Sequence, residues 1–234
     1  MNTHASPHQI LELCSGMTAF VAFDATPIPS DLSLLGAAYE EMEMSRQLSL
    51  TQRLLEAGKQ VRQGTRTWTK QDLKDVARWK HLQPLMSRIE KNLEDIDKSL
   101  GHVFEIQNEA ERIEALCRIP GIGPALASMI LTFTFPDTFC PIDYHAWNGL
   151  RSLGFGFMRK DGSGTAFTVS EFFEYLKAVR KLAKERNTTP WEVAKALHAL
   201  DKVKNRKRWR ESFDSINRAL TTRKLSISAA PSTG

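Results

Sequence analysis

Apolar residues recur at helical spacing along most of this chain, and no segment shows the strict alternation of apolar and polar residues that is typical of a strand. The clearest helical stretches contain Leu48, Leu54, Leu55 and Val61, then Leu73, Val76 and Trp79, then Ile113, Leu116 and Cys117. Pro84 interrupts the second stretch and predicts a kink or a division there. The sequence therefore predicts an all-α fold.

Two helix starts in the C-terminal third carry strong local signals. Thr168 followed by Glu171 is the pattern of a capping box, in which each side chain caps a backbone N–H of the other residue. Thr189, Pro190 and Glu192 combine an N-cap residue, a proline in the first turn and the same acidic position. The second start predicts a last helix over "WEVAKALHAL" or slightly more.

These patterns divide the chain into three parts. Residues 1–38 include the turn-rich stretch "ATPIPSD" and form an N-terminal segment of unclear role. Residues 39–225 are expected to form one helical domain, and residues 226–234 a flexible tail.

Composition narrows the class of protein. The net charge of +5 favours an anionic partner, of which nucleic acid is the most common. The three cysteines form no CxxC pair, so a structural zinc site and an iron–sulfur cluster are not expected. No apolar run reaches the 18 residues of a membrane span. We expect a cytoplasmic monomer without a membrane partner.

The stretch "IPGIG" contains two glycines directly before an apolar helix. Gly121 and Gly123 can adopt positive φ and let a ligand approach the backbone. Pro124 suits the first turn of the following helix, whose free N–H groups and dipole would attract a phosphate. The plainer interpretation is a turn that only reverses the chain between two packed helices.

A carboxylate follows at a fixed distance. Asp143, in "PIDYHAW", lies twenty residues after Gly123. Together, "LCRIPGIGPALAS" and this motif resemble the helix–hairpin–helix DNA glycosylase superfamily, which includes endonuclease III and the 8-oxoguanine glycosylases. The matching residues, about 110–154, cover one fifth of the chain, with the hairpin at about 110–135. The resemblance implies a helix–hairpin–helix glycosylase-like fold, with room for two helical subdomains around a cleft.

The resemblance also implies a role for Asp143. In the family the hairpin binds the DNA backbone and the aspartate lies beside the N-glycosidic bond of a flipped base. Breaking that bond develops positive charge on the sugar, which a carboxylate stabilises while it orients a water. Asp143 is also a good N-cap for the helix that follows it, and the two roles are compatible.

The chain departs from the family at two points. Ala125 occupies the position where bifunctional members have a catalytic lysine, and no lysine or arginine occurs between Ile119 and Trp147. No cysteine follows Cys140, so the family's four-cysteine cluster is absent. We therefore expect a monofunctional DNA glycosylase that uses water. The alternatives are a non-catalytic helix–hairpin–helix DNA-binding protein and a lyase with a lysine elsewhere.

Other residues are weaker candidates. The family's D-x-H pattern implies that His145 contacts a phosphate. The alternative is a partly buried, hydrogen-bonded histidine. Trp79 and Tyr144 are candidates for a base pocket or a wedge, although a half-buried place on an amphipathic helix suits Trp79 better. The segment from Lys202 to Arg210 has six basic residues in nine.

Two further sets of residues complete the expected DNA interface. In the basic segment, Arg206, Lys207 and Arg208 are expected to contact phosphates. The resemblance also implies that hairpin carbonyl oxygens hold a monovalent cation. These carbonyls would belong to Cys117, Ile119 and Ile122.

Overall fold

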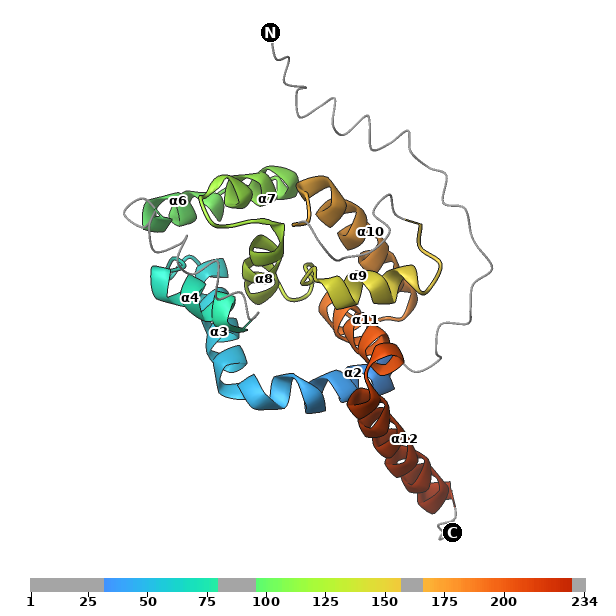
Figure 1. Ribbon diagram of the computed structural model, residues 1–234. Helices are drawn as coiled ribbons and strands as arrows, with labels where there is room; N and C mark the ends of the chain where they lie inside the picture. Colours follow the sequence, from blue (N-terminus) through green and yellow to red (C-terminus); the bar gives the residue numbers. More distant parts are fainter. Residues whose placement is uncertain (1–31, 80–95, 157–165, 229–234) are drawn as a thin grey trace, which may run out of the picture.

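The computed structural model describes residues 32–79, 96–156 and 166–228, and every regular element in these ranges is a helix (Figure 1). The all-α prediction is thus confirmed. Pro84, most of the N-terminal segment and residues 229–234 lie outside the described residues. No helix in the described ranges is long and apolar enough to cross a membrane.

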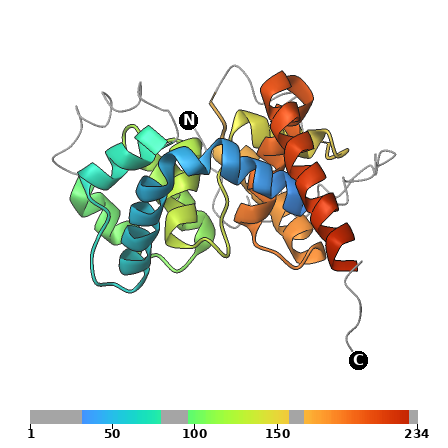
Figure 2. The same ribbon diagram turned by 90° about the horizontal axis from the view of Figure 1, so that it is seen from below.

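The helices fall into two groups that lie side by side (Figure 2). The hairpin group contains α3 (Leu48–Arg62), α4 (Lys70–Trp79), α6 (Ile96–Val103), α7 (Glu109–Arg118) and α8 (Pro124–Thr134). The carboxylate group contains α2 (Leu32–Met42), α9 (Tyr144–Arg151), α10 (Val169–Glu185), α11 (Pro190–Asn205) and α12 (Lys207–Ser228). The short helix η1 (Met44–Gln47) connects α2 to α3 and thereby joins the groups.

Helix α8 is the centre of the hairpin group. Every residue from Leu126 to Thr134 is buried, and α3, α4 and α7 pack around it. Gly58 allows α3 to cross α8 at close range, because a Cβ at this position would lie 2.1 Å from the carbonyl oxygen of Phe133. The backbones of α3 and α8 are therefore in direct contact.

Helix α11 has the same position in the carboxylate group, where it packs against α2, α9, α10 and α12. Gly149 allows α9 to approach α11 closely, since a Cβ there would lie 2.1 Å from the carbonyl oxygen of Leu197. Arg180 of α10 links the two groups: its guanidinium donates to both carboxylate oxygens of Glu109 at 2.8 and 3.0 Å, and to the carbonyl of Thr138 at 2.8 Å.

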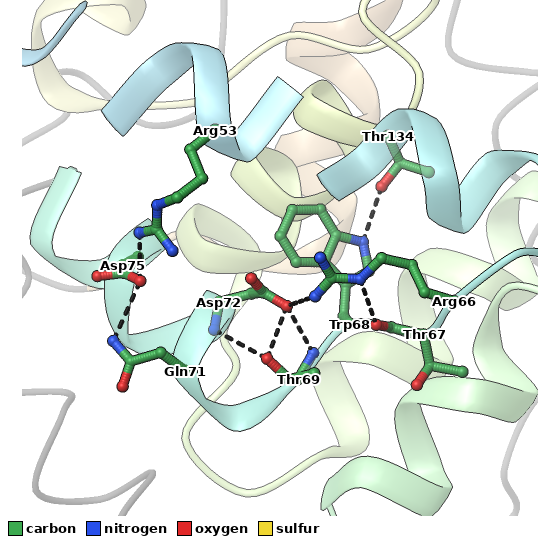
Figure 3. Close-up of polar contacts among 9 residues, drawn as sticks. All are labelled: Arg53, Arg66, Thr67, Trp68, Thr69, Gln71, Asp72, Asp75 and Thr134. Atoms are coloured by element: carbon green, nitrogen blue, oxygen red, sulfur yellow. Dashed lines mark hydrogen bonds and ion pairs between the residues drawn. The ribbon is translucent and has the colours of Figure 1, made fainter. Parts of the chain in front are cut away.

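Polar residues at the start of α4 fix the hairpin group internally (Figure 3). Asp72 accepts hydrogen bonds from the backbone N–H and the hydroxyl of Thr69 and pairs with Arg66. Trp68, fully buried, donates its indole N–H to the Thr134 hydroxyl of α8 at 3.0 Å. Asp75, one turn later, pairs with Arg53 of α3 and so ties α4 to α3.

Both predicted helix starts are confirmed, but only the first has a complete capping box. Thr168 and Glu171 form the complete capping box, and the Thr189 hydroxyl accepts the N–H of Glu192 at 3.2 Å before Pro190 starts α11. The Glu192 carboxylate pairs with Lys195 at 2.6 Å, whereas in a complete capping box it would accept the backbone N–H of Thr189.

Three expected boundaries are corrected. The helical domain includes α2 from Leu32, ahead of the expected start at residue 39, because Leu34, Leu35 and Ala38 are core residues. Helix α11 continues to Asn205. Residues 207–228 form α12, so 226–228 belong to a helix and not to the expected tail.

Candidate active site

The hairpin between α7 and α8 is a tight turn. Asn108 caps α7 by accepting the N–H groups of Ala110 and Glu111, and α7 ends at Arg118. Within the turn, the N–H of Ile122 donates to the Ile119 carbonyl at 2.9 Å. Gly121 has a φ of 91°, which confirms the need for glycine at that position.

Gly123 has a different role from Gly121. Its backbone is extended, with φ −94° and ψ 177°, so Gly123 does not use the positive φ that glycine permits. It is the N-cap of α8, and Pro124 occupies the first turn as predicted. Within the described residues, the N–H groups of Gly123 and Ala125 donate to no protein acceptor, and a Cβ at Gly123 would meet nothing within 4 Å. This open helix start can accept an anion.

Ser128 connects the hairpin helix to the candidate carboxylate. Its buried hydroxyl donates to the Ala125 carbonyl at 2.8 Å and accepts the backbone N–H of Ile142 at 3.1 Å. Ile142 directly precedes Asp143 and is fully buried. The start of α8 and the segment that presents Asp143 are therefore held at a fixed separation.

Asp143 is the N-cap of α9, and each of its carboxylate oxygens has a protein neighbour. Oδ1 accepts the backbone N–H of Ala146 at 2.7 Å, which confirms the capping role. Oδ2 lies 3.1 Å from Nδ1 of His198 on α11. The Asp143 side chain keeps 17% of its surface exposed, so solvent or a substrate can reach it.

The far side of His198 carries further charged and aromatic groups. Glu43 lies 4.0 Å from Nε2 of His198 and 3.9 Å from Nζ of Lys202. Tyr39 of α2 meets the His198 ring edge-on, with ring centroids 5.1 Å apart. Burial raises the pKa of Tyr39 well above its ordinary value, and the negative charges of Asp143 and Glu43 add to this effect.

His145 pairs with a second carboxylate. Its Nδ1 lies 2.6 Å from Oδ2 of Asp201, and the other oxygen of Asp201 accepts the Asn205 amide at 2.9 Å. Burial lowers the pKa of His145, with a smaller opposing contribution from the Asp201 hydrogen bond. His145 is thus a half-buried, hydrogen-bonded histidine, and its contact with a phosphate stays a prediction.

The two aromatic candidates lie in different environments. Trp79 is 5% exposed, packs edge-on against Phe133 and donates its indole N–H to the Thr51 hydroxyl at 2.8 Å. It is a core residue of the hairpin group, so its interpretation as a base-pocket or wedge residue is wrong. Tyr144 is 41% exposed and directly follows Asp143, where it can contact a ligand.

The basic segment spans the end of α11 and the start of α12. Arg206 is the C-cap of α11, Lys207 and Arg208 begin α12, and all three are exposed. Lys207 has a carboxylate neighbour at 3.7 Å, Oε1 of Glu211. Lys202, in contrast, points toward Glu43 and belongs to the surroundings of Asp143.

The expected cation ligands are carbonyl oxygens of the hairpin backbone. The Ile119 carbonyl already accepts one hydrogen bond, from Ile122, and a carbonyl has a second lone pair. Cation binding by Cys117, Ile119 and Ile122 stays a prediction. In the ranges that the structure describes, side chains of His, Cys, Asp and Glu form no group of three or more that could hold a metal ion.

The sequence did not point to His198, Tyr39 or Glu43. His198 is a single histidine in the helical stretch "WEVAKALHAL", 55 residues after Asp143, and no local pattern signals a contact over that distance. Comparisons of the chain with protein-family models, with curated proteins and with solved structures gave no match.

Proposed function

We propose that this protein is a monofunctional DNA glycosylase that flips and excises a modified or mispaired base, with Asp143 as its catalytic carboxylate. The observation that carries the proposal is the use of both oxygens of Asp143. Capping α9 requires only Oδ1, which accepts the Ala146 N–H. Oδ2 faces His198, and this second interaction is not needed for a cap.

The position of Asp143 also suits this chemistry. Through Ser128, the carboxylate is joined to the helix whose free N–H groups can bind a backbone phosphate. A nucleotide bound at the hairpin would therefore have its neighbouring sugar near Asp143. A water would attack the anomeric carbon, the bonding electrons would leave with the base, and Asp143 would stabilise the positive sugar and accept the water's proton.

Water is the proposed nucleophile because the usual amine is missing. Ala125 occupies the position of the family's lysine at the start of α8. Among the described lysines, Lys202 is linked to this site through Glu43 and His198. Lys202 is therefore the residue to test if a covalent intermediate is found.

The proposal is tested with duplex oligonucleotides that each carry a single lesion, scored for abasic sites after alkali treatment. Asp143→Asn keeps the capping oxygen but removes the charge, so excision should fall by roughly 100-fold or more while DNA affinity changes only a few-fold. Asp137→Asn, which removes an exposed carboxylate six residues earlier, is the matched control and should excise like wild type. Borohydride should trap no enzyme–DNA adduct.

The alternative is a non-catalytic helix–hairpin–helix DNA-binding protein, and the capping role of Asp143 is compatible with it. That alternative predicts DNA binding without excision on every lesion. Excision at the wild-type rate by Asp143→Asn would instead show that the enzyme uses a different catalytic group.

A further inference from the structure

His198 contacts the carboxylate oxygen of Asp143 that does not cap α9. It lies on α11, and its Nδ1 is 3.1 Å from Oδ2 of Asp143 on the neighbouring helix. The close approach of α9 and α11 at Gly149 makes this contact possible, because Leu197, whose carbonyl meets Gly149, directly precedes His198. Only 12% of the His198 side-chain surface is exposed.

The hydrogen-bond pattern determines which nitrogen of His198 carries a proton. An ionised carboxylate can only accept hydrogen bonds, so the nitrogen that faces Asp143 must be the donor. Nδ1 therefore carries a hydrogen. Nε2 is buried and has no hydrogen-bond partner among the described residues, and Oε1 of Glu43 lies 4.0 Å away.

Aromatic packing holds the His198 ring in this orientation. Tyr39 and His145 contact it edge-on, with centroid distances of 5.1 and 4.8 Å. The ring of Trp209, at the start of α12, lies 6.0 Å away. The ring is thus enclosed by side chains of α2, α9 and α12, and it cannot turn away from Asp143 without displacing one of them.

We propose that His198 is the positioning residue of the site: it donates Nδ1–H to Asp143, which keeps the carboxylate ionised and directs it toward the sugar. The expected effect of His198 on excision rests on the proposed function. The expected effect of His198 on the ionisation of Asp143 does not. A hydrogen bond to the charged form of a carboxyl group favours ionisation. A charged acceptor also makes this a stronger bond than one between neutral groups.

The charged and titratable groups around His198 come from α2, the residue before η1, the start of α9 and α11 itself. They are Tyr39 and Glu40 of α2, Glu43 before η1, Asp143 and His145 of α9, and Asp201 and Lys202 of α11. Substituting His198 leaves all of these groups in place, so a change in the titration of Asp143 reports on the His198 contact.

Two substitutions separate the hydrogen bond from the packing. His198→Asn keeps an N–H donor near the position of Nδ1, whereas His198→Leu has a similar size and no donor. In single-turnover excision, His198→Leu should lower the rate constant for excision by roughly 10- to 100-fold with little change in DNA affinity. His198→Asn should stay within about five-fold of wild type. Equal losses in both variants, or no loss in His198→Leu, would overturn the proposal.

A second measurement does not depend on enzymatic activity. Carbon-13 NMR of the Asp143 carboxyl group in the free protein should show protonation at a higher pH in His198→Leu than in wild type, and little change in His198→Asn. If His198→Leu shows this shift but the wild-type protein excises no base, the positioning role is supported and the proposed function is contradicted. Unchanged titration in an active enzyme would do the opposite.

If His198→Leu does not fold, as judged by circular dichroism and melting, His198→Gln replaces it. Glutamine carries its amide near the position of Nε2, so it presents no donor at Nδ1. It should therefore behave like His198→Leu in both measurements, and a fully active His198→Gln would overturn the proposal.

Discussion

The two helical groups pair their carboxylates with different kinds of side chain. In the hairpin group, Asp72 and Asp75 pair with the arginines Arg66 and Arg53 (Figure 3). In the carboxylate group, Asp143 and Asp201 pair with histidines. Arginine stays charged at every pH that a folded protein experiences, whereas the charge of histidine changes near neutral pH.

This difference indicates which group serves as a scaffold. Burial raises the pKa of Asp75, but hydrogen bonds from Arg53 and Gln71 and the charges of Arg53 and Arg78 outweigh it, so the net pKa is lowered. Its ion pairs therefore persist over a wide pH range and hold α3 to α4. Histidine as a class of partner can gain or lose a proton near neutral pH, which would suit the proposed catalytic role of Asp143.

The largest expected effects come from the two glycines at the helix crossings. Gly58→Ala and Gly149→Ala each place a Cβ 2.1 Å from a backbone carbonyl oxygen, which cannot move aside like a flexible side chain. Each should lower the free energy of unfolding in urea by about 3 kcal/mol. Gly149→Ala should also abolish excision, because it separates α9 from α11 and hence Asp143 from His198.

Gly36→Ala is the matched control for both variants. Its Cβ would be 4.0 Å from the nearest atom, in the middle of α2. Replacing a helical glycine by alanine without a clash should stabilise the protein by up to about 1 kcal/mol. A Gly149→Ala protein as stable as wild type would show that α9 and α11 are not in backbone contact.

The features that sequence predicted correctly are those encoded by neighbouring residues. The helix that contains Ile113 and Leu116, Pro124 in the first turn of α8, and the Thr168 capping box depend on residues within one or two turns of each other. Asp143 as an N-cap belongs to the same class.

The missed features depend on contacts between distant segments. Helix α12 was not expected, because its basic start indicated a charged patch rather than a helix. The pairing of His198 with Asp143 arises only when α11 packs on α9. Trp79 was one of the candidates for a ligand surface, yet the packing of α4 on α3 and α8 places it in the core.

The next effect concerns DNA binding and separates the hairpin from the basic segment. Gly123→Asp should keep its fold, because its φ suits any residue, its Cβ meets nothing and aspartate is a good N-cap. It should nevertheless weaken binding by roughly ten-fold or more even at high salt, since it places a carboxylate beside the bound phosphate. Gly123→Asn has the same shape without the charge and should bind more tightly than Gly123→Asp.

Replacing Arg206, Lys207 and Arg208 with alanine should act through salt dependence instead. Each phosphate contact contributes about −0.9 to the slope of log K against log salt on duplex DNA. The triple variant should therefore flatten the slope by about two to three units. If Gly123→Asp folds and binds DNA as wild type does, the hairpin only reverses the chain and does not contact DNA.

The smallest expected effect is a difference in acid sensitivity between the two groups. The folded-state pKa of His145 is lowered from 6.5, chiefly by burial, so below this pH the unfolded chain binds more protons than the folded one. Stability contributed by the neutral His145 is thus present above pH 6.5 and is lost as the pH falls toward its folded pKa. For Asp75, lowered from 3.8, the corresponding loss begins only below that value.

Hydrogen exchange, corrected for the intrinsic rate at each pH, can follow both groups in one sample. Amides of α9 and α11 should lose protection as the pH falls below 6.5, while those of α3 and α4 stay protected until below about 4. His145→Asn removes the titrating group and should move the onset in α9 and α11 to lower pH. His102→Asn, whose histidine is 82% exposed on α6, should leave both onsets unchanged. Loss of protection in both groups at a single pH would show that arginine and histidine pairing make no difference to acid stability.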